Sequence, residues 1–278
     1  MLIDNGLYDS YLLYDLPIPY GQKINTETQE VVKKGFDIYA PRMVDYFTFN
    51  TCVNCLLMEK NQSPDVAYIK MSYLEFLFHF SSQSEENKSA WLMLLWLLQV
   101  VLREQPFDFF VDREVNKLQF KVNDEVYTSA DFDEIKEIIC LQNEIDIDDT
   151  YMHPELKEAL EEALRVKDKL EKNDRMGSIE DMVIAYHIST GFPYEKIWEL
   201  SVRKFTKGMQ KISGKLEYEI LRTASMSGMV EFKEDIPHWL NAVEKRSKYA
   251  DVMVEASTIF EKIGNVSAAS TVEEANGL

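Results

Sequence analysis

A long run of regularly spaced apolar residues is the strongest constraint in this sequence. Between residues 201 and 227 an apolar or small side chain recurs at every third or fourth position. The members of this apolar stripe are Val202, Phe205, Met209, Ile212, Leu216, Ile220 and Thr223. Because an α-helix has about 3.6 residues per turn, this spacing places them on one side of a helix. The pattern therefore predicts one long helix from Ser201 to Ser227.

Basic residues follow the same segment on the side nearly opposite the stripe. At about 100° per residue they fall within roughly a third of the helix circumference. This basic ridge consists of Arg203, Lys204, Lys207, Lys211, Lys215 and Arg222. Three interpretations are open: the ridge binds an acidic protein surface, it binds nucleic acid, or it is a solvated face that balances the protein's own acidic patches. The net charge of -18 makes nucleic acid and anionic membranes poor default partners.

The sequence around the long helix is also helical in pattern. Pro154 begins a charged helix, in which Glu161 and Arg165 are spaced to pair. Ser178 is placed to cap the next helix, and Gly191 to end it. A short helix should follow Pro193, and a last one should run from Pro237 to about Arg246. Trp239 in that last helix either anchors a partner or simply docks the helix.

The first half of the chain has a mixed pattern. The segments Thr26–Gln29 and Ser72–Glu75 match capping boxes and predict helix starts, the first helix ending or bending at Gly35. After Pro106, the β-prone runs 107–111, 118–122 and 126–127 predict a small antiparallel sheet, and a helix is expected after Asp131. The apolar stretch Ala90–Leu102 is shorter than the ~20 residues of a membrane span. We expect it to be a buried core element.

These patterns predict an α+β fold that is mainly α. An acidic linker, residues 144–150, separates the two halves. We expect an N-terminal α+β domain with the small antiparallel sheet at residues 1–148, a helical domain at 149–248, and a partly flexible C-terminal extension at 249–278. The start of the chain lacks the basic and apolar regions of a signal peptide.

Cys52 and Cys55 form the one spacing that suggests chemistry. A CxxC pair can supply half of a zinc site or a redox couple. Cys140 and His79 are the further candidate ligands in the first domain, and both are isolated in the sequence. Because Cys52 and Cys55 lie inside an apolar run, buried core cysteines are the favoured interpretation. Metal or thiol function stays as the alternative.

Other sequence patterns favour a binding protein over an enzyme. An EF-hand loop from Asp146 would need glycine at Tyr151 and glutamate at Lys157, so that calcium motif fails. The histidines do not cluster, and motifs of hydrolases, metalloproteases and nucleotide-binding proteins are absent from the sequence. We therefore expect no catalytic residues, no cofactor and no metal.

Four stretches of the chain combine aromatic, aliphatic and glycine positions in a distinctive order. They are LPIPYGQ with TETQEVVKKGFDIY near the N-terminus, DFDEIKEIICLQN (131–143), GSIEDMVIAYHISTGFPYEKIWELSVRKF (177–205) and MSGMVEFKEDIPHW (226–239). Together they resemble a family of tailed-bacteriophage proteins described as tail assembly chaperones or tail morphogenesis proteins. The resemblance covers most of the chain.

The resemblance implies a factor in the host cytoplasm that binds the tape measure or tail tube protein during virion morphogenesis. A minor structural tail or baseplate component of the virion is the alternative. A chaperone would shield apolar segments of its partner, and an exposed stripe from Val202 to Leu216 would supply the matching surface. The predicted partner-binding residues are Lys204, Lys207, Lys211, Lys215, Phe205, Met209, Ile212, Leu216 and Trp239.

Overall fold

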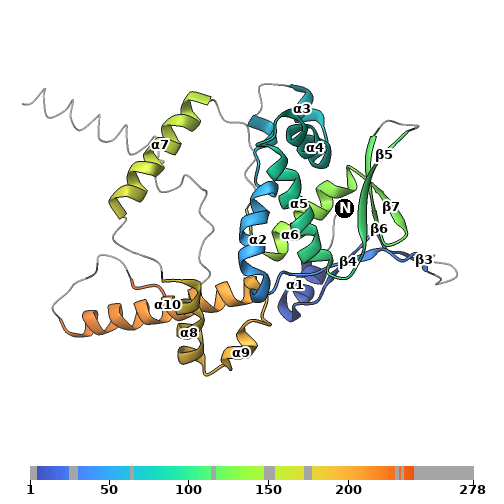
Figure 1. The fold of residues 1–278 in the computed structure, drawn as a ribbon. Coiled ribbons are helices and arrows are strands. Elements are labelled where there is room, and N and C mark those ends of the chain that lie inside the picture. The colour runs from blue at the N-terminus through green and yellow to red at the C-terminus, as the bar shows by residue number, and fades with distance from the viewer. Residues whose placement is uncertain are drawn as a thin grey trace, which may run out of the picture. The chain divides into compact units, whose positions relative to one another are not determined.

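The computed structural model describes residues 5–24, 31–62, 66–113, 117–146, 154–171, 177–228, 232 and 235–240 (Figure 1). The chain divides into two compact units. The first combines Met1–Tyr151 with Gly177–Trp239, and the second combines Met152–Met176 with Leu240–Leu278. This division differs from the expected boundary at residue 148, because the helices after Gly177 share a core and backbone hydrogen bonds with the first part of the chain.

The N-terminal segment forms short strands after one helix. Helix α1 (Asn5–Tyr14) precedes β1 (Ile18–Tyr20) and β2 (Lys23–Ile24), which pair antiparallel with β4 (Phe36–Ile38) and β3 (Val31–Lys33). The helix predicted to run from Thr26 to Gly35 is therefore wrong for residues 31–33, and residues 25–30 lie outside the described residues. Gly35 turns the chain between β3 and β4 with φ 68°, where a Cβ would lie 2.2 Å from the carbonyl oxygen of Tyr20. A side chain does not fit there.

A group of helices follows the strands. The short 3₁₀ segments η1 (Met43–Asp45), η2 (Val53–Leu56) and η3 (Lys60–Gln62) accompany α2 (Tyr46–Cys52) and α3 (Val66–Lys70), and α4 (Tyr73–Gln83) and α5 (Lys88–Leu102) come next. The capping box predicted at Ser72 is confirmed. Its hydroxyl accepts from the Glu75 amide, and the Glu75 carboxylate accepts from the Ser72 amide.

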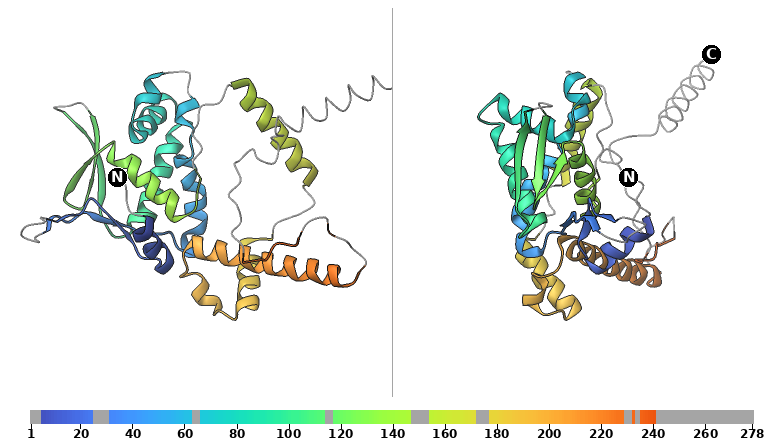
Figure 2. Two further views of the ribbon diagram at one scale, coloured as in Figure 1. Left: turned by 180° about the vertical axis from the view of Figure 1, so that it is seen from behind. Right: turned by 90° about the vertical axis from the view of Figure 1, so that its right-hand side faces the viewer.

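The predicted antiparallel sheet is confirmed. It consists of β5 (Phe107–Asp112), β6 (Lys117–Val122) and β7 (Glu125–Thr128) in the order β5-β6-β7. Helix α6 (Asp131–Gln142) follows and contacts both β7 and α4. The sheet lies beside the helices in both Figure 1 and the rear view of Figure 2. The rings of Phe120 in β6 and Phe132 in α6 meet edge to face, 6.1 Å apart, within the main core.

The remaining described helices are α7 (Pro154–Glu171), which belongs to the second unit, and α8 (Ile179–Thr190), α9 (Tyr194–Ile197) and α10 (Val202–Met226). The Ser178 cap, the Gly191 helix end and the long helix are confirmed. Residues 235–240 contain no helix, so the helix predicted from Pro237 is wrong there, and its continuation to Arg246 lies outside the described residues. The predicted α+β fold, mainly helical, is confirmed.

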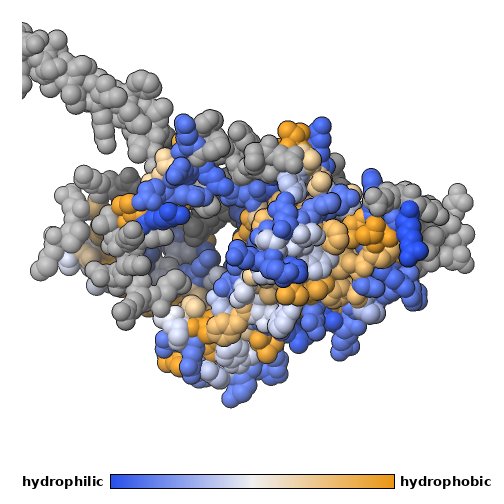
Figure 3. Space-filling model, turned by 45° about the horizontal axis from the view of Figure 1, so that its top comes forward, coloured by the Kyte–Doolittle hydropathy of each residue, from blue (hydrophilic) through white to orange (hydrophobic). Residues whose placement is uncertain are grey.

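No helix in these ranges has both the length and the apolar character of a bilayer span. Hydrophobic residues nevertheless reach the surface in several patches, which hydrophilic residues separate (Figure 3).

Candidate protein-binding surface

The start of α10 is fixed to the N-terminal part of the first unit by backbone hydrogen bonds. The Val202 amide donates to the Pro41 carbonyl at 2.9 Å, and the Met43 amide donates to the Leu200 carbonyl at 2.8 Å. Ser201 caps the helix by accepting from the Lys204 amide, and it forms a β-bridge with Arg42. These bonds set the direction in which α10 runs.

The apolar stripe is divided into a buried and an exposed half. Phe205 is 2% exposed and shares a small core with Met43, Val183 and Ile197, against which Met209 also packs. Leu216 and Ile220, by contrast, are 55% and 68% exposed. The expectation of an exposed stripe from Val202 to Leu216 is therefore wrong for its first half, because α8 and α9 cover it.

A glycine inside α10 allows α8 to approach closely. A Cβ at Gly208 would lie 2.5 Å from the Tyr186 ring, which packs at a tilt against Phe205 with a centroid distance of 5.3 Å. Past this contact the helix continues beyond α8, as both the front and rear views show (Figures 1 and 2). We define the exposed stripe as Leu216 and Ile220, which lie one turn apart on the same face of α10.

The first residues of the basic ridge contact acidic groups of the protein itself. Lys204 pairs with Asp15 at 3.2 Å, and Lys207 pairs with Glu144. Arg203 pairs with Glu144 at 3.4 Å and donates to the Leu12 carbonyl at 2.9 Å. For these three residues the structure matches the interpretation in which the ridge balances the protein's own charge.

Glu144 is the acidic centre of these contacts. Burial alone would raise the pKa of its carboxyl, but the hydrogen bond and charge of Lys207, together with Arg203, hold that pKa below its ordinary value. Its backbone is in the left-handed region at φ 57°, directly after α6. The ion pairs therefore join the end of α6 to the start of α10.

Farther along α10, ridge residues contact the helix itself and the segment that follows it. Lys215 pairs with Glu219 one turn later at 3.8 Å, and the Lys211 ammonium donates to the Trp239 carbonyl at 3.3 Å. The ring of His238 lies 5.1 Å from Tyr218 of α10. Trp239 is half-buried, and its segment contacts α10 through its backbone carbonyl and the neighbouring His238 ring.

The cysteines lie in the core of the first unit. Cys52, Cys55 and Cys140 are free and buried. Burial raises the pKa of the Cys55 thiol to about 12 and that of Cys140 to about 11, so these thiols stay protonated near neutral pH. Within the described ranges no three His, Cys, Asp or Glu side chains come together as metal ligands.

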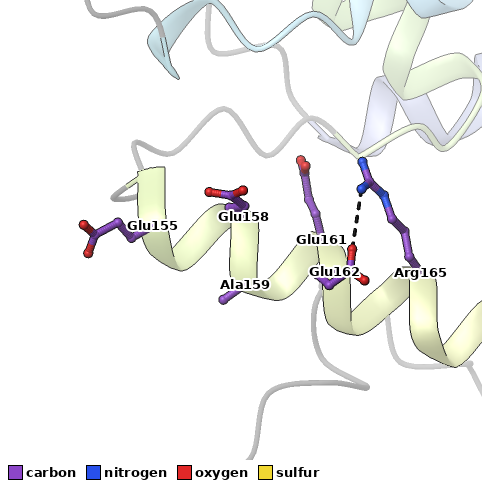
Figure 4. Close-up of a pocket in the computed structure, with 6 residues that line it drawn as sticks. All are labelled: Glu155, Glu158, Ala159, Glu161, Glu162 and Arg165. Carbon is purple, nitrogen blue, oxygen red and sulfur yellow. Dashed lines mark ion pairs between the residues drawn. The ribbon is translucent and has the colours of Figure 1, made fainter.

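A hollow along α7 has an acidic lining. The residues that line it are Glu155, Glu158, Ala159, Glu161, Glu162 and Arg165 (Figure 4). Arg165 pairs with Glu162 at 3.5 Å, not with Glu161 as its spacing predicts. All the lining residues come from one helix, so this is a charged helix face and not an enclosed site.

A second hollow, between the segment that starts at Arg42 and helix α5, is absent from the sequence predictions. The stretch Ala90–Leu102 is a core element, as expected, with Leu94 and Leu97 fully buried. Its outer side is nevertheless exposed: Trp96 lines the hollow, and Leu92 lies one turn before it. A helix that packs on one side leaves its other side exposed, and the continuous apolar sequence concealed which side that is.

Comparison with known proteins finds a similarity in the later part of the chain. A family model described as the YomV second domain matches residues 170–244, which include α8, α9 and α10. This family is phage-derived, and its description names no tail assembly role. No curated protein and no solved structure matches the chain.

Proposed function

We propose that this chain is a bacteriophage protein that binds the tape measure or tail tube protein during tail assembly, through the exposed stripe of α10. The observation that carries the proposal is the division of α10: its first half is fixed in a core, while Leu216 and Ile220 present apolar surface to solvent. Helices with apolar residues at this spacing bind other amphipathic helices. The similarity to a phage-derived family over residues 170–244 supports the phage setting.

The fixed first half gives the proposed surface a physical advantage. Because backbone hydrogen bonds and Phe205 hold the start of α10, the exposed stripe is ordered before a partner arrives. A preordered surface loses less conformational entropy on binding than a disordered one. On binding, Leu216 and Ile220 would be buried against the apolar face of the partner.

The proposal is tested by expressing the full chain with the tape measure protein and, separately, with the tail tube protein of the same phage. Size-exclusion chromatography should show a complex with one of them. Truncation of the stripe in the double variant Leu216→Ala, Ile220→Ala should weaken that complex at least about tenfold, because two large apolar side chains are lost. The control Leu156→Ala removes a comparably exposed leucine from α7 and should leave the affinity unchanged.

Charge-reversal variants distinguish a role of the basic ridge in binding a partner from its role in contacts within the protein. Lys215 pairs within its own helix, so Lys215→Glu should weaken binding to an acidic partner more at low salt than at high salt. Lys204→Glu breaks the pair with Asp15 and reports on docking of α10 instead.

Failure to bind any of the neighbouring tail proteins would refute the proposal. A fixed copy number in purified virions, measured by mass spectrometry, would favour the structural tail component.

A further inference from the structure

A second candidate binding surface lies on the first unit, on elements that the α10 stripe does not include. It is the hollow where η1 and α2 pass α5. Its walls include Arg42, Val44, Asp45, Trp96, Val100 and Arg103. Helices α2 and α5 run side by side here (Figure 1). Residues about sixty positions apart in the sequence thus form one surface.

Exposed apolar side chains lie in the hollow and close to it in the sequence. Trp96 is 58% exposed, and Leu92 lies one turn before it on the same face of α5. On the opposite wall Val44 is 66% exposed. Phe47, three residues later and outside the lining, is 65% exposed. Large aromatic side chains at the surface, clustered with aliphatic ones, are typical of protein interfaces.

Arg103 is held at the end of the hollow in a strained conformation. It ends α5 with φ 55° and ψ -118°, a region that residues with a Cβ rarely occupy. Its amide donates to the Gln99 carbonyl at 3.1 Å, and its guanidinium lies 4.1 Å above the Tyr39 ring. Strain of this kind persists where surrounding contacts impose it, and it concentrates at binding sites.

The charge of the hollow is positive on an acidic protein. Arg42 and Arg103 both line it, and Asp45 offsets one of the two charges. In the described part of the chain neither guanidinium forms a salt bridge with a carboxylate. Since the whole chain carries -18, this local excess favours an anionic group on the ligand.

We propose that this hollow binds a segment of another protein in which a carboxylate stands beside a large apolar side chain. The apolar side chain would pack against Trp96 and Val44, and the carboxylate would accept hydrogen bonds from Arg103 or Arg42. A polynucleotide fits less well, because the net charge of the chain repels its phosphates. Tryptophan and arginine are also the residues that contribute most to binding at protein interfaces.

The test selects ligands from a random dodecapeptide library displayed on an unrelated carrier, against the full-length protein. The double variant Trp96→Ala, Arg103→Gln serves for counter-selection. Selected peptides should share an aspartate or glutamate beside an aromatic or large aliphatic residue. A synthetic peptide of that consensus should bind each single variant about tenfold more weakly or worse, by fluorescence anisotropy. The control Val126→Ala, an exposed residue of β7, should bind as the unaltered protein does.

Several results would overturn this assignment. One is a set of selected peptides without the acidic and apolar pair, and another is equal binding to the double variant. A third is a peptide that binds as well after its carboxylates are replaced by amides. Sedimentation that shows a dimer abolished by Trp96→Ala would identify a second copy of the chain as the occupant. Trp96-dependent binding of a single-stranded oligonucleotide would identify a nucleic acid. Thermal unfolding of each variant, compared with the unaltered protein, confirms that it is folded.

Discussion

At the scale of single residues, Glu144 connects the pH of the solution to the docking of α10. Its pKa is lowered in the folded protein by Lys207 and Arg203, which outweigh the effect of burial. Such a group stabilises the fold above the ordinary carboxyl pKa of about 4.3, and this contribution is lost as the pH falls through the lower, folded value.

We therefore expect Glu144→Gln to lower the free energy of unfolding at pH 7. The loss should stay below about 1 kcal/mol, because the carboxylate is about one-third exposed and solvent screens its pairs. Urea unfolding at neutral pH measures this difference, and the difference should shrink as the pH is lowered through the folded pKa of Glu144. Glu155→Gln, at an exposed position of α7, is the control. It should leave the urea unfolding midpoint unchanged at neutral and at acidic pH. A deficit that persisted undiminished in acid would show that the ion pairs are not its cause.

At the scale of elements, two glycines in α10 provide a matched comparison. Glycine inside a helix costs about 1 kcal/mol relative to alanine, so alanine normally stabilises such a position. Gly214 has open space around its Cβ position, whereas a Cβ at Gly208 would clash with Tyr186 of α8. We expect Gly214→Ala to raise the free energy of unfolding by up to about 1 kcal/mol. Gly208→Ala should lower it, because the Tyr186 ring would have to move out of its contact with α10. Thermal and urea unfolding of the two variants measure both signs, and a stabilised Gly208→Ala protein would contradict the packing described for α8 and α10.

The elements also show how far periodicity predicts structure. The long helix could be predicted because its stripe from Val202 to Thr223 is a local property of the sequence. The burial of Phe205 and the exposure of Leu216 could not, because they depend on where α8 ends against α10. Strand β3 also escaped prediction: its three residues gain their hydrogen bonds from β2, and a capping pattern at Thr26 indicated a helix instead.

At the scale of the whole molecule, contacts between distant segments of the chain determine features that the sequence does not predict. The sequence order suggested a helical domain after residue 148, but Met43 and Pro41 contribute core and backbone contacts to it. The hollow beside Trp96 likewise needs Arg42 and Arg103 to meet across the fold. Each residue alone appears ordinary in the sequence, so no local pattern marks either site.

The docking of α8 and α10 onto the first part of the chain can be measured through Met43, which is fully buried in the small core with Phe205. Met43→Ala should leave a cavity and lower the free energy of unfolding by about 2–5 kcal/mol. Hydrogen exchange should then accelerate in α8 and in the first half of α10, while β5, β6 and β7 keep their protection, because the sheet packs in the other core. Met226→Ala, at an exposed position near the end of α10, is the matched control and should stay within about 0.5 kcal/mol of the unaltered protein. Uniform acceleration across the sheet and the helices would instead mean that both cores unfold as one cooperative unit. In that case α10 would lose its position only when the first unit unfolds, and the exposed stripe would stay presented as long as the protein is folded.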